Sequence, residues 1–279
     1  MHCIPNPRMH GLNGYFEVIQ TIQWGLKNLG HDVTYAVNTV EPKRINIIFG
    51  AQVLPINILE KLAPDTIIYN FEQLKSLKKE SIRPEIIYFA NKFRIWDYSI
   101  ANLEVWEKLN VQKINIVPVS YAPILTKIKN KKIQDIDILI YGMPGPKRLE
   151  VFSFVSRMGL KTIFASGMYG SARDELIARS KIILNVNLYD KSRIFEVVRV
   201  SYLLANKKAV VSLSESDTFI ENGYEKVVQF ITPNEFEKKI LTLINNDQMR
   251  TEIENNGYEF ISSKDIRVVL KEQLKELNL

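Results

Sequence analysis

Residues 137–165 read DILIYGMPGPKRLEVFSFVSRMGLKTIFA, and the architecture follows from this segment. An apolar, β-branched run leads into a loop with Gly142 and Gly145, then into a helical pattern that ends near Gly159, and finally into a second apolar run. Short apolar strands that alternate with helices are typical of α/β proteins with parallel sheets. We therefore expect strand, helix and parallel strand here.

The same alternation extends in both directions from this segment. Upstream, apolar runs at 45–50, 65–70 and 114–119 are separated by helical patterns, of which 15–30 is the clearest. Downstream, the helical pattern SRIFEVVRVSYLLANK leads into the apolar run KAVVSLS. The fold class predicted from the residues is therefore α/β, with parallel sheets in both halves.

A lysine-rich segment, TKIKNKKI at 126–133, separates the two halves. It is typical of a solvated linker, and a patch that contacts phosphate is the alternative. We predict an N-terminal domain at 1–125, a C-terminal domain at 126–262, and an amphipathic helix at 263–279 that crosses back to the N-terminal domain. Two such Rossmann-like domains would face each other across a cleft, with ligands at the carboxyl ends of the strands.

Composition narrows the class of protein. The 279 residues are 46% hydrophobic and 24% charged, with 12 glycines and 11 prolines, which excludes a disordered or collagen-like chain. A single cysteine excludes a disulfide framework and fits a reducing, cytoplasmic location, and no apolar run approaches the roughly 20 residues of an integral membrane segment. The net charge of +6 suits either a nucleic acid or an anionic small molecule.

The loop NPRMHGLNG at 6–14 is the first candidate site. Gly11 and Gly14 would let the backbone approach a ligand at the following helix N-terminus, although a turn that needs two glycines is the alternative. His10 is the histidine best placed to act as a general base near neutral pH. Three histidines without paired spacing make a metal site an unfavourable interpretation.

The loop YGMPGPKRLE at 141–150 is the second candidate. Gly142 opens the backbone, and Lys147 and Arg148 lie in the first turn of the predicted helix. Cations at a helix N-terminus oppose the helix dipole, and a bound anion would offset that repulsion. We therefore predict phosphate binding here, with a solvated pair of charges as the alternative.

The third candidate is the helical pattern that begins near residue 195. Glu196, Arg199 and Tyr202 recur at three-residue spacing, which places them on one polar stripe. A carboxylate and an arginine close to a strand end suit ribose hydroxyls and a diphosphate. An ordinary surface ion pair is the alternative.

Polar residues also follow two strands of the N-terminal half. Asn70, Glu72 and Gln73 follow one apolar run, and Asp97 lies beside another. At the cleft edge they would contact the hydroxyls of an acceptor, and either carboxylate would serve as the base of an inverting transfer. Capping and turn roles explain them equally well.

These segments resemble glycosyltransferases of the GT-B fold, specifically the group-1-like family. The resemblance rests on GYFEVIQTIQWGLKNLGHDV, YGSARDELIARSKIILNV and LLANKKAVVS. It implies that the C-terminal domain binds a nucleotide sugar and that the N-terminal domain binds the acceptor. It departs from the family where Tyr202 replaces a common acidic residue and where Asn206 and Lys207 replace a common glycine.

The expected function is therefore metal-independent transfer of a hexosyl or pentosyl group from a nucleotide sugar to an acceptor hydroxyl. No cofactor or metal is expected, because the chain has no Asp-x-Asp motif in a suitable loop and no ligand cluster. A glycan, a lipid or a small molecule is the expected acceptor; a modified nucleic-acid base, or a catalytically silent nucleotide-sugar-binding module, stays open. The predicted site residues are His10 and Glu72 (catalytic); Gly142, Lys147, Arg148, Asn185, Glu196, Arg199 and Tyr202 (donor); and Gly11, Asn13, Gly14, Asn70, Gln73 and Asp97 (acceptor).

Overall fold

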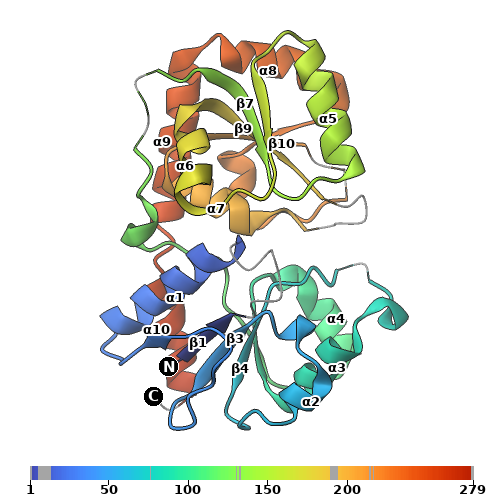
Figure 1. Ribbon diagram of the computed structural model, residues 1–279, viewed down its shortest axis with the longest axis vertical. Coiled ribbons are helices and arrows are strands. Elements are labelled where there is room, and N and C mark those ends of the chain that lie inside the picture. Colours follow the sequence, from blue (N-terminus) through green and yellow to red (C-terminus); the bar gives the residue numbers. More distant parts are fainter. Residues whose placement is uncertain are drawn as a thin grey trace. The chain divides into compact units, whose positions relative to one another are not determined.

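The structure is a computed structural model that describes residues 2–5, 14–75, 77–129, 131, 133–188, 194–213, 215 and 217–277. The chain divides into two compact units (Figure 1). The N-terminal unit comprises Met1–Ala122 and Asp265–Leu279, and the C-terminal unit comprises Pro123–Lys264. The boundaries expected from the sequence fall after 125 and 262, and these divisions fall after 122 and 264.

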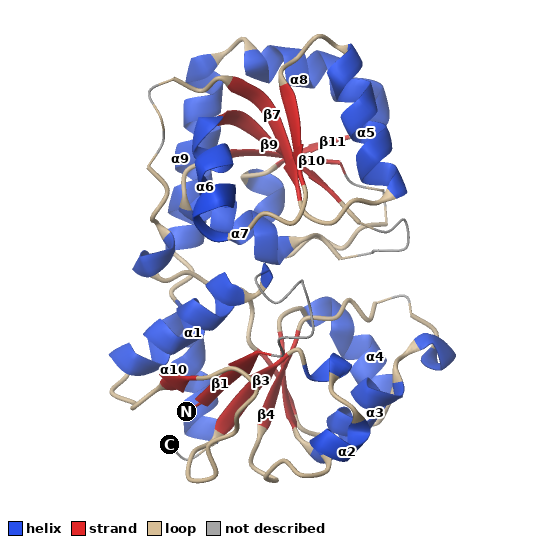
Figure 2. Ribbon diagram, viewed as in Figure 1, coloured by secondary structure: helices blue, strands red, loops and turns tan. Residues whose placement is uncertain are grey.

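The N-terminal unit is built on a six-stranded parallel sheet in the order β2-β1-β3-β4-β5-β6. Its strands are β1 (His2–Pro5), β2 (Thr34–Tyr35), β3 (Asn46–Phe49), β4 (Ile67–Asn70), β5 (Arg94–Asp97) and β6 (Ile114–Ile116). Its helices are α1 (Phe16–Asn28), α2 (Ile56–Leu59), α3 (Pro84–Lys92), α4 (Leu103–Lys108) and α10 (Ile266–Glu276). Strands β3 and β4 are buried at every position, as expected of a sheet with helices on both faces (Figure 2).

The C-terminal unit is built on a five-stranded parallel sheet in the order β11-β10-β9-β7-β8. Its strands are β7 (Ile136–Tyr141), β8 (Thr162–Ala165), β9 (Ser180–Val186), β10 (Ala209–Leu213) and β11 (Gln229–Ile231). Its helices are α5 (Pro146–Arg157), α6 (Gly170–Arg179), α7 (Val197–Ala205), α8 (Phe236–Ile244) and α9 (Asp247–Ser262).

Short 3₁₀ turns occur in both units. They lie at Ala51–Val53, Lys79–Ser81, Ile100–Asn102, Pro123–Leu125, Tyr224–Lys226 and Pro233–Glu235. The predicted α/β class with parallel sheets is confirmed.

Both sheets contain a switch point, where the strand order reverses relative to the chain. In the N-terminal unit it lies between β1 and β3, and in the C-terminal unit between β7 and β9. Helices that follow the two strands of a switch point lie on opposite faces of the sheet, so the loops diverge and leave a crevice at the carboxyl ends. The loop after β7 and the residues after β9 are therefore the parts of the C-terminal unit best placed to meet a ligand.

The last helix, α10, packs against α1 in the N-terminal unit. Gly25 makes this contact close, because a Cβ there would lie 2.7 Å from Leu270 Cδ1 and 2.9 Å from Ile266 Cγ2. The Arg267 guanidinium lies over the Trp24 ring at 5.1 Å, which adds a cation–π contact. A glycine in the middle of α1 thus allows α1 and α10 to pack closely against each other.

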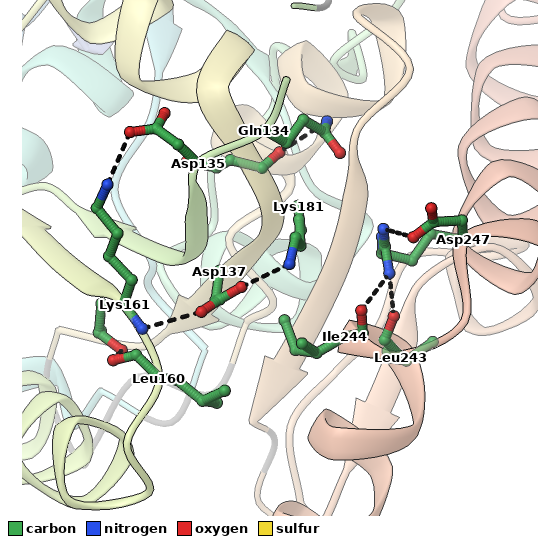
Figure 3. A network of polar contacts seen from close by, with 12 residues as sticks. Gln134, Asp135, Asp137, Leu160, Lys161, Lys181, Leu243, Ile244 and Asp247 are labelled. Atoms are coloured by element: carbon green, nitrogen blue, oxygen red, sulfur yellow. Dashed lines mark hydrogen bonds and ion pairs between the residues drawn. The ribbon is translucent and has the colours of Figure 1, made fainter. Parts of the chain in front are cut away.

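An ionic network lies at the opposite, amino ends of the strands of the C-terminal unit (Figure 3). Asp135 pairs with Arg179 at 2.6 Å and with Lys161 at 2.7 Å. Asp137 accepts hydrogen bonds from Lys181 Nζ at 2.7 Å and from the Lys161 backbone N–H at 3.0 Å. Each of the three cations has a carboxylate partner, the five side chains together carry one net positive charge, and they lie at the end of the sheet away from the switch-point loops.

Asn206 attaches the lysine-rich segment to the C-terminal unit. Its Oδ1 accepts hydrogen bonds from the backbone N–H groups of Lys127 and Ile128 at 2.9 and 2.8 Å, and its Nδ2 donates to the carbonyls of Leu125 and Tyr202. The start of 126–133 is therefore held against the end of α7 by a side chain that is only 2% exposed. Within the described ranges, no helix is long and apolar enough to cross a membrane.

Replacing Asn206 with alanine removes a side-chain partner from four backbone groups, of which the Lys127 N–H and the Leu125 carbonyl keep their hydrogen bond to each other at 3.0 Å. We expect Asn206→Ala to lower the free energy of unfolding by about 1–3 kcal/mol and to speed tryptic cleavage after Lys127. Urea unfolding and timed digestion measure the two effects. Asn28→Ala, which removes one exposed bond to the Trp24 carbonyl, is the control. Equal cleavage rates in both variants would contradict this role for Asn206.

Candidate functional site

Two arginine side chains meet over Gly142, directly after β7. Gly142 has a φ of +122°, which side-chain-bearing residues rarely adopt. A Cβ at this position would lie 2.9 Å from Arg199 Nη2 and 3.0 Å from Arg148 Nη1. Glycine is therefore required both by the backbone conformation and by the two guanidinium groups that occupy the space.

Arg148, in the first turn of α5, is buried, with only 2% of its side chain exposed. Its Nε donates to the Val186 carbonyl at 2.8 Å, its Nη1 to the Met143 carbonyl at 2.9 Å, and its Nη2 to Glu196 Oε1 at 2.7 Å. Burial and the neighbouring Arg199 charge lower the pKa of Arg148 to about 10, although Glu196 opposes the shift. Arg148 thus stays protonated at neutral pH and joins the loop after β7 to the end of β9.

Glu196 is shared between the two arginines. Its Oε2 lies 2.7 Å from Arg199 Nη1, while its Oε1 accepts from Arg148. Glu196 is the residue immediately before α7, so the carboxylate is delivered to the switch point by the start of that helix. We call Arg148, Glu196 and Arg199 the arginine cluster; it carries one net positive charge.

Arg199 is the more exposed arginine of the cluster, with 17% of its side chain accessible. Its Nη1 also donates to Asn185 Oδ1 at 3.2 Å, and its guanidinium lies 5.1 Å from the centre of the Tyr141 ring. Asn185 is itself held by a hydrogen bond to Ser212 Oγ at 3.0 Å. In the part of the chain that the structure describes, Arg199 Nη2 makes no hydrogen bond, so this donor is available to an anion beside Gly142.

The N-terminus of α5 lies at the same loop. Pro146 occupies the first turn, Gly145 is the N-cap residue, and no side chain caps the helix. Uncapped backbone N–H groups and the positive end of the helix dipole favour an anion at this point. The loop after β7 therefore combines a helix terminus with the arginine cluster, and a phosphate group suits this combination.

Two predicted donor residues make other contacts. Lys147 forms an ion pair with Glu215 and lines a cavity of about 350 Å³ together with Phe154 and Phe236, beside α5. Tyr202, expected on the polar stripe, is only 3% exposed, and its hydroxyl donates to Asp174 at 2.9 Å. Neither side chain has a described contact with the arginine cluster.

In the N-terminal unit, Glu72 follows β4 and is half-buried. Gln52, just after β3, donates a hydrogen bond from Nε2 to Glu72 Oε1 at 2.8 Å. Burial raises the pKa of Glu72 above its ordinary value, while the Gln52 bond and the Arg83 charge oppose the shift. A carboxyl with a raised pKa at the carboxyl edge of a parallel sheet is suited to acid–base chemistry.

Asp97 and Asn70 lie inside the N-terminal unit, 0% and 2% exposed. The Asp97 carboxylate accepts hydrogen bonds from Asn70, Asn102, Trp106 and the Ser99 backbone N–H, at 2.7–3.1 Å. Burial raises the pKa of Asp97 to about 6 in spite of these donors. Both residues were expected to contact an acceptor, and the structure buries both of them within the N-terminal unit.

Solved structures with a similar fold identify the architecture of the chain. The solved structure of Anabaena HepE in complex with UDP and glucose matches with a TM-score of 0.64 and 13% identity, over 99% of this chain and 100% of that chain. An alpha-glucosyltransferase solved with UDP and a 13-mer DNA containing an HMU base matches with a TM-score of 0.64 and 12% identity, over 100% of this chain and 99% of that chain. The chain has the GT-B glycosyltransferase fold.

Comparison of amino-acid sequences identifies fewer informative relatives than comparison of structures. No family model matches the chain. An uncharacterized protein of Acanthamoeba polyphaga mimivirus is 26% identical over 192 residues, which cover 67% of this chain and 61% of that protein. The GT-B chain therefore spans less than two thirds of the length of this viral relative.

Other predicted residues divide by their place in the structure. His10, Gly11 and Asn13 lie outside the described residues. Gly14 precedes α1, and a Cβ there would meet nothing within 4 Å. Gln73 is half-buried in the loop after β4. Among the described residues, no group of three or more His, Cys, Asp or Glu side chains could hold a metal ion.

Sequence reasoning missed several partners in this GT-B chain. Gln52 contacts Glu72, Ser212 contacts Asn185, and Asn102 contacts Asp97. Each of the three lies at or just beyond the carboxyl end of a strand, and this position was the signal available in the sequence. Their pairing was not readable, because it depends on which strands are neighbours.

The raised pKa of Asp97 predicts a specific dependence of stability on pH. The folded protein holds a proton on Asp97 up to about pH 6, whereas the unfolded chain releases it near 3.8. The contribution of Asp97 to the free energy of unfolding therefore falls by about 2 kcal/mol as pH rises from 4 to 7. Urea unfolding of wild type and Asp97→Asn at several pH values measures it as a falling difference between the two proteins. A flat or rising difference would contradict the assignment.

Proposed function

We propose that the chain is a glycosyltransferase that moves a sugar from a nucleotide-sugar donor to an acceptor hydroxyl. One observation carries the proposal: two arginines meet over Gly142 at the switch point of the second sheet, beside the uncapped N-terminus of α5. This arrangement suits the diphosphate of a nucleotide sugar. The fold shared with glycosyltransferases supports the same interpretation.

The C-terminal unit would bind the donor. Arg199 Nη2 and the backbone N–H groups of the first turn of α5 would donate to the diphosphate. Buried Arg148 would add charge while it holds the loop in place. A carboxylate offers about four lone-pair positions, so Glu196 could accept a ribose hydroxyl while it keeps both arginines in place.

The chemistry asked of this site is stabilisation of a leaving group. The bond between the anomeric carbon and the phosphate oxygen breaks, and its electron pair passes to the departing nucleoside diphosphate. Arginines fixed before the reaction begins stabilise that charge without reorganisation. We therefore propose a metal-independent transfer, with the arginine cluster supplying the positive charge and no cofactor other than the donor.

The acceptor side would lie in the N-terminal unit. The acceptor hydroxyl must lose a proton as it attacks the anomeric carbon. In an inverting transfer Glu72 would accept that proton, and His10 stays a second candidate for the base. In a retaining transfer the departing phosphate would accept the proton, and Glu72 would instead orient the hydroxyl.

Two findings bear on donor and acceptor. HepE was solved with UDP and glucose, so UDP-hexoses are the donors we propose to test first. The alpha-glucosyltransferase was solved with DNA that contains an HMU base, which together with the net charge of +6 favours a modified nucleic-acid base as the second candidate acceptor. A glycan, a lipid or a small molecule remains our first proposal.

Arg199→Ala tests the donor site. An arginine that contacts phosphate contributes about 1.5–3 kcal/mol, so we expect roughly ten- to hundredfold weaker UDP binding by titration calorimetry. Arg179→Ala removes the same charge at the opposite sheet edge, where Arg179 pairs with Asp135, and should leave UDP affinity unchanged. Equal affinity in both variants, with intact thermal stability, would remove the arginine cluster from the donor site.

Glu72→Gln tests the acceptor side. If Glu72 is the base, turnover should fall by about two to four orders of magnitude while UDP affinity stays the same. The assay follows UDP release from UDP-glucose in the presence of glycan, lipid, small-molecule or HMU-containing DNA acceptors. Donor binding without turnover in wild type would point to a silent binding module, and full turnover in Glu72→Gln would exclude a base role.

A further inference from the structure

We propose that Asp97 is a positioning residue that sets the orientation of the loop carrying Glu72. It acts through two asparagines, Asn70 and Asn102, and not by touching the loop itself. The catalytic consequence rests on the proposed function of Glu72, whereas the positioning itself does not. The proposal concerns residues 71–75, which we call the β4 loop.

Asp97 is held in an unusual setting for a carboxylate. It is fully buried, and its hydrogen-bond donors in the described part of the chain are two side-chain amides, one indole and one backbone N–H, all of them neutral. Burying a carboxylate without a cation is unfavourable, and an apolar residue would avoid this penalty. The presence of a carboxylate here is therefore best explained by the orientation that its acceptor oxygens impose on the side-chain amides of Asn70 and Asn102.

The first effect is on Asn102. A carboxylate accepts hydrogen bonds and cannot donate them, so the Asn102 amide must turn its Nδ2 toward Asp97, at 3.0 and 3.1 Å. Its Oδ1 then faces the β4 loop, where it accepts from the backbone N–H groups of Leu74 and Lys75 at 2.8 and 3.2 Å. The same Nδ2 donates to the Glu72 carbonyl at 2.9 Å.

The side-chain amide of Asn70 is oriented in the same way. Its Nδ2 donates to Asp97 Oδ2 at 2.8 Å and to the Glu72 carbonyl at 3.2 Å, while its Oδ1 accepts from the Glu72 backbone N–H at 3.2 Å. Both backbone polar groups of Glu72 are thus held by amides whose direction Asp97 selects. Rotation of either amide by half a turn would place N–H against N–H at the loop.

Glu72 is thereby fixed at both ends. Asn70 and Asn102 hold its backbone, and Gln52 holds its carboxyl at 2.8 Å. Reacting groups that are held in position before the reaction lower the barrier, and a small displacement is costly. Asp97 itself makes no described hydrogen bond with any atom of the β4 loop, so an effect of Asp97 on that loop has to pass through the asparagines.

Hydrogen exchange followed by mass spectrometry tests the positioning without any substrate. In Asp97→Asn, we expect amides of the β4 loop to exchange roughly tenfold faster, the factor that corresponds to one weakened hydrogen bond. Asn102→Ala should give a similar increase, and it carries the test if Asp97→Asn does not fold. The double variant should add less than the sum of the two single effects, because Asp97 acts on the loop partly through Asn102, while the route through Asn70 is separate.

Asn46→Ala is the matched control. Asn46 is another buried asparagine of the N-terminal unit, and it holds residues 41–44 by contacts with Glu41 and Arg44. Its replacement should speed exchange at 41–44 and leave the β4 loop unchanged. Unchanged exchange of the β4 loop in Asp97→Asn, or an equal change in Asn46→Ala, would overturn the proposal.

Turnover separates this inference from the proposed function. With UDP-glucose as donor, Asp97→Asn should lower kcat by roughly ten- to hundredfold while the Kd for UDP stays that of wild type, and Asn46→Ala should change neither. Faster loop exchange together with full activity in Glu72→Gln would leave the positioning intact and refute the catalytic role of Glu72. Unchanged loop exchange with a loss of activity in Glu72→Gln would refute the positioning and leave the proposed function intact.

Discussion

One carboxylate held between two guanidinium groups organises the carboxyl edge of the second sheet. Glu196 contacts both Arg148 and Arg199 at 2.7 Å, and these three residues come from the first turn of α5, the residue before α7 and the first turn of α7. Buried Arg148 would be an unfavourable isolated charge, so its carboxylate and its two carbonyl acceptors are needed together. The loop after β7, the end of β9 and the start of α7 are thereby fixed relative to one another.

The two units hold polar side chains at the carboxyl ends of their strands by different interactions. The C-terminal unit uses opposite charges, and its excess of one cation leaves Arg199 Nη2 directed at Gly142. The N-terminal unit uses a carboxylate surrounded by neutral donors, so that direction is imposed through amides and no ion pair is involved. The first arrangement suits an anion, and the second is the one that we propose orders the β4 loop.

The amino ends of the strands in the C-terminal unit carry a second network of charged side chains. Asp135 and Asp137 are matched by Lys161, Arg179 and Lys181, and the cations all have partners. The hydrogen bonds from Arg179 and Lys161 hold the pKa of Asp135 far below its usual range. In this network each cation has a carboxylate partner, whereas Arg199 Nη2 at the carboxyl ends of the strands has no hydrogen bond to the described residues.

The sequence by itself determined the α/β class and the alternation of strands and helices, because these depend on local periodicity and on glycine. It also singled out Arg148, Glu196 and Arg199, but as members of two separate candidate segments. Tertiary structure decided which side chains meet. Lys147 and Arg148 are adjacent in sequence, yet one pairs with Glu215 and the other with Glu196, since neighbouring residues on a helix point in different directions. Tyr202 continues the spacing of Glu196 and Arg199 but is buried against Asp174, and Asp97 reaches the β4 loop only through Asn70 and Asn102. Most of these pairings join residues that are distant in the chain, and the order of the strands in a sheet decides which of the helices and loops that follow them come within hydrogen-bonding distance.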